Sequence, residues 1–163
     1  MIDRTLKLSP HFTLGELIPE DCDFVPAEVL VNLEVLASEV LEPIRAYFGR
    51  PILIHSGYRP PKHNAAVGGV LSSDHPAGRA ADFHVTGNDD ITWQTSTLSA
   101  FVWIRENLKG RFGQVILEDH RKRLKKPGKL WVHVSTPSVR HPGANDVNAV
   151  LLSSAPGEYT ALA

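Results

Sequence analysis

Apolar residues recur at helical spacing between residues 27 and 48. This pattern predicts one long amphipathic helix, which Gly49 would end. Pro43 falls inside the pattern and is expected to bend or break the last turns, because proline cannot donate the helical hydrogen bond. The apolar stripe consists of Val29, Leu33, Leu36, Val40, Ile44 and Tyr47.

Two other segments carry helix signals. Thr13 and Glu16 form a capping box, with Phe12 and Leu17 as its hydrophobic staple, so a short helix should begin there and stop before Pro19. A further helix is expected to be capped by Asp90 and to end at Gly110. Its inward residues are predicted to be Leu98, Phe101, Val102 and Leu108.

Four short segments predict strands, at residues 51–55, 79–85, 114–118 and 130–135. The first two are separated by residues 56–78, which read as one long loop. A loop of about twenty residues is uncommon in a compact domain and is often functional. We therefore expect this loop to be tied down, or to contain structure that the pattern does not reveal.

Strand alternation brings polar side chains from three predicted strands to one face, while the opposite, apolar face would pack against helices. The polar residues are Asp82, His84, Glu118 and His133. His75 lies seven residues before Asp82, across a turn that can fold it back over the strand. Two imidazoles and one carboxylate leave one position open on a tetrahedral zinc ion, as a catalytic site requires.

The composition fits a single globular domain over residues 1–163, with 42 % hydrophobic and 21 % charged residues. One cysteine excludes an internal disulfide framework and a four-cysteine zinc site. The N-terminus lacks the apolar run of a secretory signal, and no run of apolar residues is long enough to span a membrane. Residues 137–163 are rich in turn-forming residues and predict no clear element.

Charge is unevenly distributed, although the formal net charge is only -1. Residues 119–129 carry six basic residues and one acidic residue. This segment is either a solvated hairpin loop that balances the acidic N-terminal third, or a surface that attracts an anionic polymer. It has no interleaved aromatic residue on which bases could stack, so nucleic acid is not the expected partner.

Residues 73–82, SDHPAGRAAD, match the pattern S-x-H-x-x-G-x-A-x-D at every specified position. Together with W-x-H at residues 131–133, they resemble the M15 family of zinc D-alanyl-D-alanine carboxypeptidases and murein endopeptidases. The SGYR sequence at residues 56–59 and the opening LSPHFTLGEL at residues 8–17 also match, the latter resembling the phage and prophage branch. The resemblance covers residues 8–136.

The resemblance implies one zinc ion per chain, with His75, Asp82 and His133 as ligands. It also implies that Arg59 binds a substrate carboxylate. The implied fold is α+β, with a central, mainly antiparallel sheet and helices packed on one side, as in zinc DD-peptidases and hedgehog-like domains.

Three other residues are candidates for substrate contact, each with a simpler structural alternative. Ser73 could instead be a turn hydroxyl, His84 a half-buried histidine, and Trp131 a cover for the sheet.

The chain departs from the family pattern at one position. Many family members place an acidic general base three residues before the last zinc histidine, where this chain has Leu130. Alternation puts Glu118 on the same face as His133, so we predict Glu118 as the base. Asp119, on the opposite face, and His84 are weaker candidates.

The leading hypothesis is therefore a monomeric zinc peptidase of peptidoglycan stem peptides, acting as a carboxypeptidase or as an L-alanyl-D-glutamate-type endopeptidase. Because no signal is evident, we expect synthesis in a bacterial cytoplasm. The enzyme would reach the wall after phage- or pore-mediated release, like an endolysin, or as part of a virion. The alternatives are a zinc-containing, non-catalytic cell-wall-binding or virion module of the same fold, and an anion- or nucleic-acid-binding domain that uses the basic segment.

Overall fold

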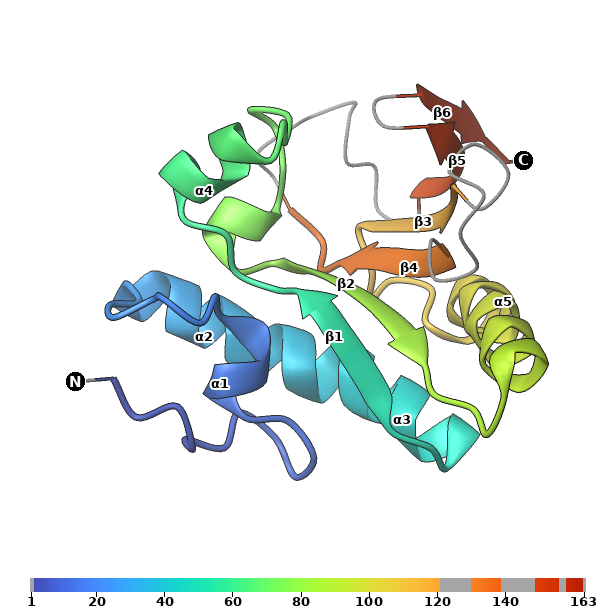
Figure 1. Cartoon of the computed structure of the whole chain (residues 1–163), viewed down its shortest axis with the longest axis horizontal. Helices are drawn as coiled ribbons and strands as arrows, with labels where there is room; N and C mark the ends of the chain where they lie inside the picture. Colours follow the sequence, from blue (N-terminus) through green and yellow to red (C-terminus); the bar gives the residue numbers. More distant parts are fainter. Residues whose placement is uncertain (1, 121–129, 139–148, 156–157, 163) are drawn as a thin grey trace.

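The computed structural model describes residues 2–120, 130–138, 149–155 and 158–162. Their centre is a six-stranded sheet of order β1-β2-β4-β3-β5-β6, in which only β3 and β5 pair in parallel (Figure 1). The prediction of an α+β fold with a mainly antiparallel sheet is confirmed. The strands are β1 (Ile52–Ser56), β2 (Ala80–Val85), β3 (Gln114–Asp119), β4 (Leu130–Ser135), β5 (Ala149–Ala155) and β6 (Glu158–Ala161).

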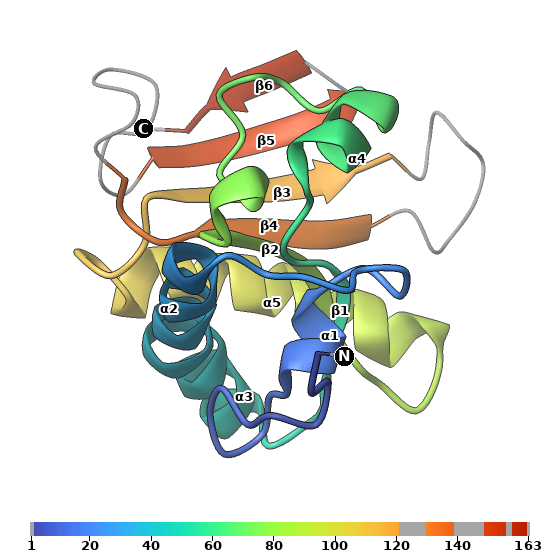
Figure 2. The same ribbon diagram turned by 90° about the vertical axis from the view of Figure 1, so that its left-hand side faces the viewer.

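The long helices pack against one face of this sheet and bury its apolar side chains. Phe83, Val115 and Val132 of the sheet are fully buried in the same core as Leu33 and Ile44. The helical elements are α1 (Leu14–Leu17), α2 (Ala27–Leu36), the π-turn η1 (Ala37–Leu41), α3 (Glu42–Phe48), α4 (Pro61–Ala66), the 3₁₀ turn η2 (His75–Ala77) and α5 (Asp90–Asn107). The short elements α4 and η2 lie over the other face (Figure 2).

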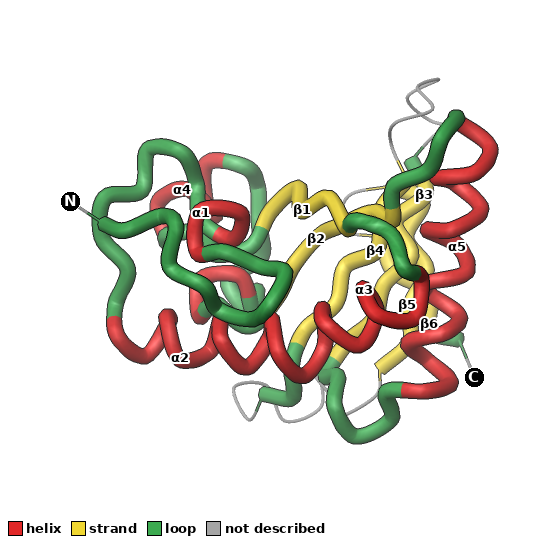
Figure 3. The backbone as a smooth tube through the Cα atoms, turned by 90° about the horizontal axis from the view of Figure 1, so that it is seen from below, coloured by secondary structure: helices red, strands yellow, loops and turns green. Residues whose placement is uncertain are grey.

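Residues 27–48 form one continuous helical run, as the hydrophobic stripe predicts (Figure 3). Pro43 does not break it. Instead, the five residues before α3 form a π-turn, in which the Glu42 N–H donates to the Ala37 carbonyl. A π-turn re-pairs the backbone groups that proline disrupts, so the run continues to Gly49, which ends it at a φ of 60°.

Two other sequence predictions need correction. Residues 56–78 are not one loop, because Pro61 starts helix α4 and His75 starts turn η2. In α5 the cap is Asp89, whose carboxylate accepts from the Thr92 N–H at 2.7 Å, rather than Asp90. The helix ends at Asn107, before Gly110.

The predicted inner face of α5 is also wrong in part. Leu98 and Val102 are 36 % and 47 % exposed, and Ala100 and Ile104 are buried with Phe101. The face that meets the sheet is thus rotated relative to the predicted stripe.

The turn-rich C-terminal segment holds the two strands that the sequence did not predict, β5 and β6. Of the basic segment 119–129, residues 121–129 lie outside the described part of the chain, so its two interpretations stay untested. Among the described residues, no helix is long and apolar enough to cross a membrane.

Candidate metal centre

Three side chains predicted as ligands converge on the face of the sheet opposite the long helices. Asp82 on β2 and His133 on β4 are direct cross-strand partners, so their side chains emerge side by side. His133 Nδ1 lies 2.8 Å from Asp82 Oδ1. His75 Nε2 lies 3.2 Å from the same oxygen and 3.3 Å from His133 Nδ1. No other group of three potential ligands of this kind occurs in the described part of the chain.

A backbone carbonyl fixes the orientation of the His75 ring. Its Nδ1–H donates to the Gly57 carbonyl at 2.7 Å, and its side chain is 1 % exposed. This hydrogen bond assigns the proton to Nδ1 and leaves the Nε2 lone pair aimed at Asp82 and His133. The Ser73 hydroxyl accepts from the His75 backbone N–H at 3.4 Å, so the structure shows Ser73 supporting the turn.

Two glycines allow this placement. Gly78, which ends η2, has a φ of 70°, and a Cβ there would lie 2.8 Å from the carbonyl oxygen of Val29 on α2. A Cβ on Gly57 would lie 2.4 Å from the Leu17 carbonyl. Glycine is therefore required at both positions. Gly78 allows the positive φ and the close approach to α2, and Gly57 allows the close approach to α1.

The electrostatics of the cluster favour a cation. Burial opposes ionisation of Asp82, yet the adjacent imidazoles of His75 and His133 hold its pKa far below the usual range. Burial lowers the pKa of His75, against the attraction of Asp82. A neutral imidazole beside an ionised carboxylate is the protonation state that a metal ion requires of these ligands.

The donor set fits zinc. Ligand atoms about 2.0–2.1 Å from a tetrahedral zinc ion lie roughly 3.3 Å from one another, and imidazole nitrogen and carboxylate oxygen are common zinc ligands. The three separations in the cluster, 2.8 to 3.3 Å, are close to that spacing. Three protein ligands would leave a fourth position for water or substrate.

Glu118 stands beside this cluster. It pairs with Trp131 across β3 and β4, two residue pairs along the strands from the pairing of Ile116 with His133. Its side chain is 14 % exposed. Burial, reinforced by the negative charge of Asp82, raises the pKa of Glu118 to about 7. A carboxyl group that titrates near neutral pH is suited to accept and return a proton.

Arg59 brings a positive charge to the same region. Burial lowers its pKa, and the negative charges of Asp82 and Glu118 oppose that shift. Its backbone N–H donates to the His75 carbonyl at 3.2 Å. Its buried Nε has no hydrogen-bond partner among the described residues. A buried donor without a partner is costly, so the hydrogen bonds of this guanidinium are incomplete within the described residues.

Leu130, at the family's usual acid position, is not available for chemistry. It is 1 % exposed and alternates with His133 along β4, so it lies on the helix-facing side. In a regular strand, the residue three positions before a ligand cannot share the ligand's face. An acid on the neighbouring strand is thus the alternative that this sheet offers.

The remaining candidates lie on the cluster's face but do not join it. The rings of His84 and Trp93 are 5.1 Å apart, and His84 Nδ1 lies 2.7 Å from His55 Nε2. Trp131 packs edge-on against His120, with ring centroids 5.0 Å apart. Neither contact tests a role in substrate binding, so that role stays a prediction for both residues.

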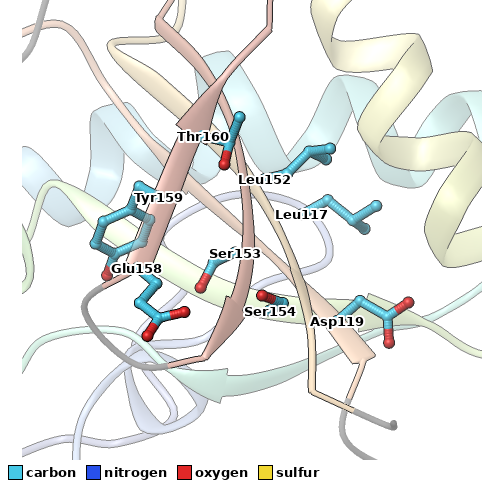
Figure 4. Close-up of a pocket in the computed structure, with 8 residues that line it drawn as sticks. All are labelled: Leu117, Asp119, Leu152, Ser153, Ser154, Glu158, Tyr159 and Thr160. Atoms are coloured by element: carbon cyan, nitrogen blue, oxygen red, sulfur yellow. The ribbon is translucent and has the colours of Figure 1, made fainter. Parts of the chain in front are cut away.

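A hollow of about 730 Å³ is lined by residues of β3, β5 and β6. Figure 4 shows Leu117, Asp119 and Leu152 on one side of it, with Glu158 and Tyr159 on the other. Asp119 shares this hollow with Leu117, in agreement with its predicted position on the face opposite Glu118. The metal cluster, built on β2, β4 and η2, does not line the hollow.

One residue beside Glu118 was missed. His120, which the sequence analysis did not name as a candidate, is 3 % exposed, and its Nε2 lies 3.3 Å from Glu118 Oε2. The signal was present, because residues 118 and 120 share one face of an extended chain.

Comparison with known proteins agrees with the resemblance. The family model described as Peptidase M15 matches residues 10–114, which include Arg59, His75 and Asp82. His133 and Glu118 lie beyond the matched segment. No curated protein matches the chain. M15 enzymes are zinc-dependent peptidases, and the cluster is a donor set that could hold that metal. Because the matched segment covers well over half of the chain, the chain belongs to the peptidase M15 family.

Proposed function

We propose that this protein is a zinc peptidase that hydrolyses peptidoglycan stem peptides, either by removing a terminal D-alanine or by cutting an L-alanyl-D-glutamate-type bond. The observation that carries the proposal is the buried cluster of His75, Asp82 and His133, with the charges of Glu118 and Arg59 next to it. Stem peptides end in a carboxylate, and the Arg59 guanidinium, a cation near the charges of Asp82 and Glu118, is suited to pair with such a group.

In this proposal His75, Asp82 and His133 hold the metal. When bound there, zinc supplies Lewis acidity, which lowers the pKa of water and polarises a carbonyl. Glu118 accepts the proton of the attacking water on its carboxylate and returns it to the leaving amine nitrogen. Arg59 pairs with the substrate carboxylate through two parallel N–H···O bonds and so aligns the scissile bond.

The test combines metal analysis with product identification. Purified protein is expected to contain one zinc per chain and to release defined fragments from murein, identified by mass. A chelator is expected to stop the reaction, and added zinc to restore it. Mass identification also separates the two bond types, because a carboxypeptidase releases only free D-alanine. Zinc-loaded protein that is inert on both murein and soluble stem peptides would instead support the non-catalytic wall-binding module.

A further inference from the structure

Glu118 has a buried neighbour that the proposed mechanism does not use. His120 Nε2 lies 3.3 Å from Glu118 Oε2 and 3.4 Å from the hydroxyl oxygen of Ser153 on β5. The edge-on contact with Trp131 holds the plane of its ring. Three neighbouring strands therefore contribute to fixing one imidazole beside one carboxylate.

The hydrogen-bond network assigns the proton on this imidazole. The Ser153 hydroxyl donates its only hydrogen to the Ala155 carbonyl at 2.9 Å, so it presents lone pairs to His120. An ionised Glu118 also presents only lone pairs. Because both groups facing Nε2 are acceptors, the hydrogen is assigned to Nε2, which lies 3.4 Å from Ser153 Oγ and 3.3 Å from Glu118 Oε2.

We propose that His120 is a positioning residue, which holds the Glu118 carboxylate toward the metal cluster through its Nε2–H. This inference rests on the proposed function, in which Glu118 moves the proton. A glutamate has three rotatable side-chain bonds, and proton transfer requires its oxygen within hydrogen-bond reach of the water. A fixed donor beside Oε2 restricts those rotations, as partners behind metal-site groups generally do. Ser153, tied to Ala155, in turn holds the imidazole.

A matched pair of substitutions separates positioning from packing. His120→Gln keeps an N–H donor near the position of Nε2, whereas His120→Phe keeps a ring against Trp131 and removes the donor. We expect His120→Phe to lower kcat about ten- to a hundredfold, with KM within about twofold and one zinc retained. His120→Gln should recover most of the lost kcat. His11→Gln, an exposed histidine paired with Glu42, is the control.

The proposal is overturned if His120→Phe keeps the wild-type kcat, if both variants lose kcat equally, or if the loss follows loss of zinc. The last two results would give His120 a purely structural role.

A second measurement does not depend on activity. In ¹⁵N spectra of the zinc-loaded protein, the His120 Nε2–H signal, assigned by its absence in His120→Gln, should shift when Glu118 becomes glutamine. An unchanged signal overturns the contact, including when His120→Phe does not fold. If the wild type is inert on murein while the signal shifts, the proposed function fails and the His120–Glu118 contact stands.

Discussion

Two pairs of histidines lie on the same face of the sheet, one pair including His75 from turn η2, and the pairs differ in burial and in the charge beside them. In the buried pair, His75 and His133, the facing nitrogens are 3.3 Å apart and share contact with Asp82. In the outer pair, His55 and His84, the facing nitrogens are 2.7 Å apart and His55 is exposed. A bulge between Ile54 and Ser56 accompanies the outer pair.

The difference is that the buried pair has a third potential ligand. Asp82 is kept ionised by both imidazoles, and its negative charge would compensate a bound cation. His75 and His133 are also buried, which limits the access of water to their ring nitrogens. The outer pair has an aromatic neighbour instead, Trp93, and belongs to none of the three-ligand groups found in the described residues.

The largest expected effect comes from removing a ligand of the buried pair. His75→Ala or His133→Ala should lower bound zinc from one per chain to none and abolish hydrolysis, because two protein ligands remain. His55→Ala in the outer pair should leave one zinc. Metal analysis after dialysis measures both. Full zinc occupancy in His133→Ala, or loss of zinc in His55→Ala, would break the comparison.

The next effect concerns the acid beside the buried pair. Glu118→Gln keeps the size of the side chain but removes the proton acceptor. Zinc content should stay at one per chain while kcat falls by about 10²–10⁴. Asp119→Asn, on the opposite face, is the matched control and should cost little. Steady-state kinetics on a soluble stem peptide decides, and the reverse pattern would refute the assignment of Glu118.

A smaller loss is expected from the cation at the cluster. Arg59→Ala should lower kcat/KM by about ten- to a hundredfold and leave zinc bound, because a charge-assisted contact contributes roughly 1.5–3 kcal/mol. Arg59→Lys should recover only part of the loss, since an ammonium cannot pair through two parallel bonds. Unchanged kinetics for Arg59→Ala would give the guanidinium a structural role.

The smallest effect is one of stability, and it measures the cost of burying Glu118. The pKa of Glu118 in the folded protein, about 7, lies above the ordinary value of a glutamate, so the folded state binds this proton more tightly. The contribution of Glu118 to the stability of the metal-free wild type should therefore be lost as pH rises from about 4.5 to 7. A pKa difference of this size between the folded and unfolded states corresponds to roughly 3 kcal/mol of unfolding free energy. In Glu118→Gln, weakening of the contact with His120 offsets part of the stability that is gained by removing the buried charge.

We accordingly expect metal-free Glu118→Gln to be about 1–2 kcal/mol more stable than wild type at pH 8, and the gain to vanish below about pH 4.5. Urea unfolding in the presence of a chelator gives both values. A gain that is constant with pH would show that Glu118 is not the titrating group.

Strand alternation predicted the site well because it depends only on local geometry. The faces assigned to Asp82, Glu118 and His133 agree with the observed register. The C-terminal strands were missed because their identity depends on partners distant in sequence: β5 joins the sheet beside β3, across a parallel pairing that leaves no local turn signal.

Two other failures have different origins. Pro60 and Pro61 read as loop residues, although proline is common at the first position of a helix and Pro61 begins one. The role of His120 depends on Glu118, Trp131 and Ser153, which come together only once three strands have paired.

The direct pairing of Asp82 with His133 has a consequence for how this family can vary. Two of the three proposed ligands, Asp82 and His133, are fixed by sheet register, so insertions in a connecting segment should leave them in place. A single-residue deletion within β4, by contrast, would turn the His133 position toward the core and bring an apolar neighbour to the metal. Length changes are therefore tolerated between these strands and excluded within them, which makes the strand interiors the part of the gene that a designer must leave intact.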